Sequence, residues 1–371
     1  MKSKTWPRLR LGVEALECRD CPSITTLVTD HGHTLRIQGS KQAEHVWLAQ
    51  NDDSDQLQLY WSSSDDGVHT MLVQSQTFQS SAIRRIVIDL RGGNDALDYT
   101  LEGNSGLRYA KALNVNLGAG NDAATFDFAG PGVTWPPTRT GDDTLVYVGE
   151  TTPGLPVLAN LKIALAAGSG DDQVSCAFGQ VAVGVQAAFL ADLGTGNDSA
   201  SAVLYGGIAS GAALNVALLG GTGNDSLTTD TGGQARIEVG GAMNLILDGQ
   251  QGDDLISHYF GGTISGQLSA KLAGGQGADS MSAKTVASWD SSGKIGTTVN
   301  GGIGDDRLTV LTTVTPPPPE IVFILPWTPG LKSRQAVDGG QGMDSAEISQ
   351  GVGVLRCESL TVRAADFAFG R

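Results

Sequence analysis

Apolar and polar residues alternate along most of this chain with a period of two, which is typical of β-strands with one buried face. The alternation is clearest over residues 113–117, 161–165, 214–218, 243–247 and 268–272. An amphipathic helix would instead repeat its apolar residues at i, i+3, i+4 and i+7, and no stretch keeps that spacing for more than one turn. The pattern therefore predicts an all-β fold.

A glycine-rich turn follows these strands and recurs ten times, complete or nearly complete, as Gly-x-Gly-(Asn/Asp)-Asp. Its last residues are Asp95, Asp122, Asp143, Asp172, Asp198, Asp225, Asp254, Asp279, Asp306 and Asp344. Most successive copies lie 25 to 29 residues apart. A nearly constant period in this range is typical of stacked repeats. We therefore expect a parallel β-helix, or β-solenoid, of about ten coils of roughly 27 residues, right-handed as parallel crossovers generally are.

The repeats do not extend evenly over the chain. Residues 1–24 form a separate basic segment, which we expect to be an export or sorting segment that is mostly disordered or forms a short helix. Residues 25–91 alternate but lack the glycine turns, so we expect irregular first coils or capping hairpins there. Residues 92–371 carry the regular solenoid repeats. Proline-rich stretches at 128–139 and 315–335 should leave the stack as loops, because proline cannot donate to a β-ladder.

Charge and composition narrow the function. Asp and Glu number 39 against 24 Lys and Arg, so the net charge is −15. This sign disfavours nucleic acids and anionic membranes as partners and suits cations. The longest apolar run covers residues 321–325, far short of the roughly 20 residues that a transmembrane helix needs. Glycine is abundant, at 51 residues, but without the three-residue period of collagen.

Stacked copies of the turn would place one carboxylate per coil in a single column. Neighbouring coils lie about 4.8 Å apart. Two carboxylates at that distance repel by about 0.9 kcal/mol in water and about 3.5 kcal/mol at an effective dielectric constant near 20. Bound cations would relieve this repulsion. Side chains that splay into water, or backbone N–H groups that bind the carboxylates, would relieve it as well.

Calcium suits such a column because it takes about six to eight oxygen ligands from carboxylates and backbone carbonyls. The residue before the last aspartate is Asn or Asp in eight of the ten copies, which offers a second side-chain oxygen. The candidate metal ligands are therefore the ten aspartates above together with Asn121, Asp142, Asp171, Asn197, Asn224, Asp253 and Asp305. The alternative is a metal-free solenoid whose corners are capped by these side chains.

Three copies of the turn, at residues 220–228, 274–282 and 301–309, match Gly-Gly-x-Gly-x-Asp-x-hydrophobic-x at each fixed position. This motif resembles the calcium-binding repeat of RTX, or haemolysin-type, proteins. The resemblance implies Ca²⁺ as the cofactor and a parallel β-roll. RTX repeats follow one another every nine residues, whereas these copies stand about 27 residues apart, which favours a wider coil with one calcium-binding edge.

A second resemblance concerns location. Residues 7–23 are similar to the export motif of planctomycete cell-surface and extracellular proteins, Arg-Leu-x-x-Glu-x-Leu-Glu-x-Arg followed by Pro-Ser. The matching residues are Arg10, Leu11, Glu14, Leu16, Glu17, Arg19, Pro22 and Ser23. The resemblance implies an extracellular or cell-surface protein. Cys18 and Cys21 fall in the same segment, but zinc needs four ligands and no second pair follows.

The sequence therefore predicts a calcium-binding β-solenoid with a structural or adhesive role outside the cell. Its candidate partners are calcium and cell-envelope polysaccharides or surface proteins, with no nucleic acid and no membrane span. Because parallel β-helices include polysaccharide lyases and hydrolases, an enzyme is the further alternative. A catalytic site would gather carboxylates and basic groups on one face, whereas these aspartates are periodic. We therefore expect no enzymatic activity.

Overall fold

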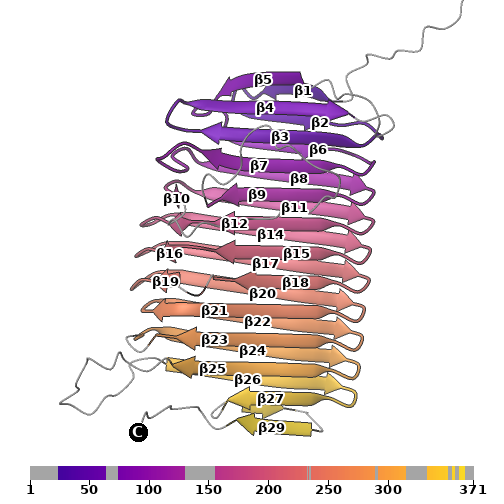
Figure 1. The fold of residues 1–371 in the computed structure, drawn as a ribbon, viewed down its shortest axis with the longest axis vertical. Coiled ribbons are helices and arrows are strands. Elements are labelled where there is room, and N and C mark those ends of the chain that lie inside the picture. The colour runs from indigo at the N-terminus through magenta and orange to yellow at the C-terminus, as the bar shows by residue number, and fades with distance from the viewer. Residues whose placement is uncertain are drawn as a thin grey trace, which may run out of the picture.

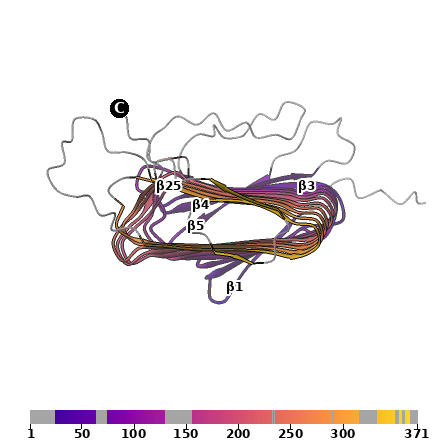
Figure 2. The ribbon, with the colours of Figure 1, turned by 90° about the horizontal axis from the view of Figure 1, so that it is seen from below.

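The computed structural model describes residues 24–63, 74–129, 155–231, 233, 235–288, 291–314, 332–349, 353–355 and 359–363. In this part of the chain every regular element is a β-strand. The strands stack in successive layers along one axis (Figure 1). Viewed along that axis, each coil is flattened, with one sheet on each of its two long sides (Figure 2). The prediction of an all-β parallel solenoid is confirmed.

The first sheet has 12 strands. In spatial order these are β1 (Thr25–Thr29), β2 (Thr34–Gln38), β6 (Arg85–Asp89), β8 (Lys111–Ala119), β11 (Leu161–Ser169), β14 (Gln186–Thr195), β17 (Ala213–Thr222), β20 (Ala242–Gln251), β22 (Gln267–Gln276), β24 (Lys294–Ile303), β26 (Lys332–Gln341) and β28 (Gly353–Leu355). From β2 onward every neighbouring pair in this sheet is parallel, and each coil contributes one strand to it.

The second sheet has 17 strands. They are β3 (Glu44–Asn51), β4 (Gln56–Ser63), β5 (Gln74–Gln79), β7 (Ala96–Glu102), β9 (Ala123–Phe128), β10 (Pro156–Val157), β12 (Gln173–Phe178), β13 (Gln180–Val181), β15 (Ser199–Leu204), β16 (Gly207–Ile208), β18 (Ser226–Asp230), β19 (Ala235–Ile237), β21 (Leu255–Ile264), β23 (Ser280–Ala287), β25 (Arg307–Val314), β27 (Ser345–Ser349) and β29 (Ser359–Arg363). In each regular coil the chain leaves the first sheet, passes through the glycine turn and enters the second sheet.

The core lies between the two sheets, because the strands of the regular coils bury every second residue. In β11 the residues Leu161, Ile163 and Leu165 are buried, while the residues between them face outward. Aromatic rings reinforce the N-terminal half of this core, where Phe128 stacks on Phe178 with ring centroids 6.1 Å apart. The described part of the chain contains no helix that is long and apolar enough to cross a membrane.

Antiparallel pairing occurs at the N-terminal end of the stack. The pairs β1–β2, β3–β4 and β4–β5 are antiparallel, and the other strand pairs among the described residues are parallel. In Figure 1 these hairpins lie at the indigo end of the solenoid. They close an end that would otherwise expose unpaired strand edges to other chains.

The predicted number of about ten coils is slightly too high. β8 pairs directly with β11, and β9 pairs directly with β12, so no coil lies between Asp122 and Asp172. The copy of the turn that ends at Asp142 and Asp143 therefore adds no layer there, and both residues lie outside the described residues. The motif alone does not reveal whether the chain around it has enough strand to close a coil.

Most of the two expected loops also lies outside the described residues, which omit 130–154 and 315–331. Phe128, at the start of the first expected loop, is the buried last residue of β9. β24 pairs in register with β26 across the second interval. β24 and β26 are thus direct neighbours in the first sheet despite the long gap between Asp306 and Asp344.

Candidate functional site

The glycine turns form one edge of the solenoid, where they stack directly above one another (Figure 1). Their backbone requires glycine. In a representative turn, Gly221 and Gly223 have φ angles of 110° and 125°, which side-chain-bearing residues rarely adopt. A Cβ on Gly223 would lie 1.7 Å from the carbonyl oxygen of Gly196 in the preceding coil. Glycine therefore permits both the turn and the close stacking of successive turns.

The last aspartate of each turn points into the stack rather than into water. Its Oδ1 accepts a hydrogen bond from the backbone N–H of the matching aspartate in the preceding coil, as when Asp198 N donates to Asp225 Oδ1 at 2.8 Å. These donor–acceptor distances run from 2.7 to 3.0 Å. We call this column the inner ladder: Asp95, Asp122, Asp172, Asp198, Asp225, Asp254, Asp279, Asp306 and Asp344, each only 1–2 % exposed.

The residue before each aspartate forms a second column, the outer ladder, which is exposed. Here the bonds run the other way, because Oδ1 accepts from the backbone N–H of the following coil. Asn224 N, for example, donates to Asn197 Oδ1 at 2.9 Å. The acceptors are Asn94, Asn121, Asp171, Asn197, Asn224, Asp253 and Asp305. Most steps between coils are thus joined by two side-chain hydrogen bonds of opposite direction.

The structure brings the predicted site residues together in these two ladders, apart from Asp142 and Asp143. It also adds a first rung that the sequence pattern did not reveal. Glu44 N donates to Asp95 Oδ1 at 2.8 Å, and the Glu44 side chain is buried in the same column. Gly39 precedes Glu44 by five residues, the spacing of Gly220 and Asp225. Because the segment has Glu in place of Asp and lacks the Gly-x-Gly turn, only this spacing could have identified it.

Burial raises the pKa of the eight inner-ladder carboxyls from Asp95 to Asp306. Desolvation is the largest cause, and neighbouring carboxylates add to it at several rungs, while the backbone N–H bonds act against it. The pKa rises to about 8 for Asp95 and about 7 for Asp172. It rises to about 6 for Asp198, Asp225, Asp254, Asp279 and Asp306. These groups therefore resist carrying a negative charge unless something compensates it.

The second oxygen of these carboxyls is the chemically unusual feature. Oδ2 is buried and has no hydrogen-bond partner in eight rungs: Asp95, Asp122, Asp172, Asp198, Asp225, Asp254, Asp279 and Asp306. Leaving a buried polar group unsatisfied costs about 1–3 kcal/mol, and more for a charged group. A repeated orphan oxygen therefore indicates that a proton or a cation belongs beside it.

Four corners offer a cation a second kind of oxygen. Gly220, Gly249, Gly274 and Gly301 each precede a ladder aspartate by five residues. A Cβ on these glycines would lie 2.0–2.3 Å from the Oδ2 of that aspartate and 2.3–2.8 Å from the carbonyl oxygen of the matching glycine in the following coil. A carboxylate oxygen and a carbonyl oxygen thus approach the same space. Both are the hard donors that Ca²⁺ prefers.

The donor set fits calcium better than a metal that needs many side-chain ligands. No group of three or more His, Cys, Asp or Glu side chains is arranged to hold a metal ion in the described part of the chain. A cation in these corners would bind one or two carboxylates, and backbone carbonyls would supply further ligands. Calcium accepts such a mixed oxygen shell.

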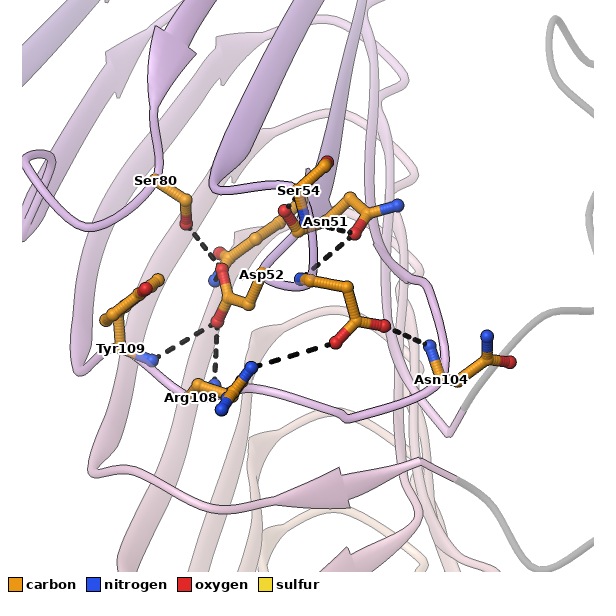
Figure 3. A network of polar contacts seen from close by, with 9 residues as sticks. Asn51, Asp52, Ser54, Ser80, Asn104, Arg108 and Tyr109 are labelled. Carbon is orange, nitrogen blue, oxygen red and sulfur yellow. Dashed lines mark hydrogen bonds and ion pairs between the residues drawn. The ribbon is translucent and has the colours of Figure 1, made fainter.

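A different polar network lies at the N-terminal end of the solenoid (Figure 3). Its centre is the buried Asp52, in the turn between β3 and β4. Asp52 Oδ1 accepts from Gln50 Nε2 at 2.7 Å and from Ser80 Oγ at 2.6 Å. Asp52 Oδ2 accepts from the backbone N–H groups of Arg108 at 2.7 Å and Tyr109 at 3.2 Å. The network joins the capping hairpin to the first regular coils.

Lys111 belongs to the same region and is 3 % exposed, at an inward position that the next coil fills with Leu161. Its Nζ donates to the carbonyl oxygen of Ser80 at 2.7 Å. Burial lowers the pKa of Lys111 to about 8, and the nearby Asp52 and Asp55 act against this shift. The sequence alone could not identify this cluster, because all but one of its hydrogen bonds join residues 28 to 57 positions apart.

Comparisons with protein-family models, with curated proteins and with solved structures found no match for this chain, so its function has to be argued from its own geometry.

Proposed function

We propose that this chain is a calcium-stabilised structural β-solenoid that works outside the cell or at its surface. The observation that carries the proposal is the set of eight buried carboxylate oxygens without hydrogen-bond partners. In four of these corners a glycine carbonyl oxygen of the next coil lies beside the orphan oxygen. Calcium would supply the missing positive charge and bind both kinds of oxygen.

The physical need for a cation comes from the spacing of the ladder. Buried carboxylates about 4.8 Å apart repel one another by roughly 3.5 kcal/mol per pair at an effective dielectric constant near 20. The aspartates would neutralise the cation, and the glycines would let the coils approach closely enough to surround it. Calcium would then join adjacent coils directly, since each cation would contact oxygens from two layers.

Two sequence resemblances support the extracellular location, which is itself a proposal. The turns resemble RTX calcium-binding repeats, and residues 7–23, which lie outside the described residues, resemble a planctomycete export motif. Free calcium is scarce inside cells and abundant outside them. A solenoid of this kind would therefore remain loose before export and become rigid afterwards.

One observation favours polysaccharide as a partner. The outward face of the second sheet carries an unbroken column of half-buried hydroxyl side chains, one per coil: Thr125, Ser175, Ser201, Thr228, Ser257, Ser282 and Thr309. Evenly spaced hydroxyl groups suit hydrogen bonding to a polymer of sugars. We expect the wild-type chain to sediment with insoluble cell-envelope polysaccharide, and a variant with Ser201→Glu and Thr228→Glu to stay in solution. Equal sedimentation of both would contradict this partner.

A metal-free solenoid is the second candidate, and the hydrogen bonds of the inner ladder favour it. Each Oδ1 already has a backbone donor, and a proton on Oδ2 would remove the remaining charge. The raised pKa values make such protonation easier than in an ordinary aspartate. Both candidates describe a structural protein, and the expectation that the chain is not an enzyme stays a prediction.

Thermal unfolding distinguishes the two candidates. The full chain is melted at pH 7.5 after complete chelation, and then with excess CaCl2 or, as a control for ionic strength and divalent charge, excess MgCl2. We expect calcium to raise the melting temperature by many degrees and magnesium to raise it much less, because magnesium demands octahedral geometry and releases water reluctantly. A melting temperature that calcium does not change would refute the calcium proposal.

A further inference from the structure

The residue five positions before each ladder aspartate divides the inner ladder into two halves. In the N-terminal half this residue is apolar and fully buried: Leu90, Leu117, Ala167 and Leu193, which precede Asp95, Asp122, Asp172 and Asp198. In the C-terminal half it is always glycine: Gly220, Gly249, Gly274, Gly301 and Gly339, which precede Asp225, Asp254, Asp279, Asp306 and Asp344. Among the ladder aspartates the change occurs once, between Leu193 and Gly220. The Glu44 rung also has a glycine at this position, Gly39, but a Cβ there would lie 2.8 Å from Glu44 Oε2, against 2.0–2.3 Å from Oδ2 in the C-terminal corners.

In the C-terminal half, the space that a side chain would take is occupied by oxygen atoms. At Gly249, for example, the position of a Cβ lies 2.0 Å from Asp254 Oδ2 and 2.8 Å from the carbonyl oxygen of Gly274. Asp254 is 2 % exposed, and its Oδ2 has no hydrogen-bond partner. An unpartnered, fully buried oxygen therefore points toward a space that already contains a backbone carbonyl.

In the N-terminal half, hydrocarbon fills the matching position. Leu90, Leu117, Ala167 and Leu193 are each 0 % exposed, so their side chains are packed inside the stack. A methyl or isobutyl group offers no ligand to a cation, and it prevents the carboxylate oxygen and the carbonyl from sharing the same space. A divalent cation that entered such a corner would lose water ligands without replacing them.

We propose that, among the aspartate rungs, divalent cations bind only in the four glycine corners between Asp225 and Asp344, and that the apolar corners from Asp95 to Asp198 remain free of cations. The proposal rests on the calcium function inferred above and specifies which rungs perform it. It makes the C-terminal half of the solenoid the calcium-dependent half.

The hydrophobic cores of the N-terminal and C-terminal halves of the solenoid also differ. The core of the N-terminal half contains the aromatic contacts Phe126–Phe189 and Phe128–Phe178, with ring centroids 5.9 and 6.1 Å apart. In the C-terminal half, among the residues that the structure describes, the only fully buried Phe, Tyr or Trp side chain is that of Phe260. The half that has glycine corners thus has fewer buried aromatic side chains in its core.

This division has a consequence for folding. In a solenoid each coil contacts only its neighbours, so one part can loosen while another remains folded. The N-terminal half is further held by the capping hairpins and by the Asp52 network. Removal of calcium should therefore unfold the C-terminal coils first, so that calcium would determine whether that half of the molecule is folded.

Hydrogen exchange of the full chain tests the division directly. Amide exchange is measured by mass spectrometry at pH 7.5 with excess CaCl2 and again with excess chelator, and calcium binding is counted by calorimetry on the same sample. We expect chelation to speed exchange at least tenfold in peptides from β17 onward and to leave peptides from β6 to β12 unchanged. Equal acceleration in both halves, with calcium bound, would overturn the division but not the calcium function. If no calcium binds, the calcium function itself fails.

Substitutions at the corner residues test whether the glycine corners, and not the apolar corners, bind calcium. Gly274→Ala would push a methyl group into Asp279 Oδ2 and Gly301 O, at 2.1 and 2.5 Å. It should reduce the calcium count from four to three. Gly296→Ala is the matched control, since a Cβ there meets nothing within 4 Å and lies away from the corners. Ala167→Gly should add a fifth calcium by opening an apolar corner. An unchanged count in both Gly274→Ala and Ala167→Gly would contradict the proposal.

Discussion

Without calcium, the inner ladder should make this protein less stable as the pH rises from 4.5 to 7.5. The folded-state pKa is raised to about 6 for five rungs, against an ordinary value of 3.8. Between these values the unfolded chain has released its protons while the folded chain still holds them. Raising the pH therefore favours unfolding, which is the reverse of the usual behaviour of a paired aspartate.

The size of the effect follows from the same shifts. A rise from 3.8 to about 6 corresponds to about 3 kcal/mol per carboxyl, since one pKa unit equals about 1.4 kcal/mol. A single rung would thus change the free energy of unfolding measurably, and several rungs together would change it more. His258 opposes this trend, because burial lowers its pKa to about 4 from 6.5. One such histidine offsets only about one rung.

Urea unfolding followed by circular dichroism measures the free energy of unfolding at pH 4.5, 6.0 and 7.5 in excess chelator. We expect the free energy of unfolding to fall at each step, and excess calcium to restore it at pH 7.5 but not at pH 4.5, where protons already occupy the carboxyls. A free energy of unfolding that increases with pH in chelator would show that the ladder is not strained by its charge.

Three further substitutions follow from the same geometry. Asp254→Asn keeps an acceptor for the backbone N–H but removes a buried charge. In chelator at pH 7.5 it should therefore raise the free energy of unfolding by about 1–3 kcal/mol, and calorimetry with calcium should count one ion fewer. A free energy of unfolding below that of the wild type in chelator would contradict this. Asp52→Ala removes an acceptor with four hydrogen bonds and should lower the free energy of unfolding, measured in urea, by about 3–5 kcal/mol. Asp53→Ala changes a more exposed neighbour and should lower the free energy of unfolding much less. Equal losses in the two variants would show that the Asp52 network does not hold the capping hairpin to the first coils. Gly223→Ala places a Cβ 1.7 Å from a carbonyl oxygen and should lower the melting temperature by more than ten degrees, so near-wild-type melting would refute the tight stacking of the turns.

The repeating part of the fold could be predicted from sequence because its determinants are local. Alternation of apolar and polar residues identifies the strands, and the period of the glycine turns identifies the stacking. The columns of Asp225 and Asn224 follow from these two features, since in-register coils place equivalent residues above one another. The sequence thus predicted which carboxylates come together.

The direction of those carboxylates could not be predicted, because it depends on contacts between coils. Whether Asp225 faces water, a cation or a backbone N–H is decided by its bond to Asp198 in the coil before it. The sequence also predicted a coil at Asp143, whereas β8 pairs directly with β11 and β9 with β12, because a turn motif does not show whether the chain around it closes a coil. Glu44 was missed for the opposite reason, since it occupies a rung without the motif.

The most direct test of the account is a crystal structure of the full chain grown with CaCl2, with anomalous scattering data collected to locate calcium. We expect anomalous peaks in the corners between Asp225 and Asp344, each within bonding distance of a ladder Oδ2 and a glycine carbonyl oxygen. A well-ordered inner ladder with no anomalous peak in any of its corners would contradict the central claim that calcium joins these coils.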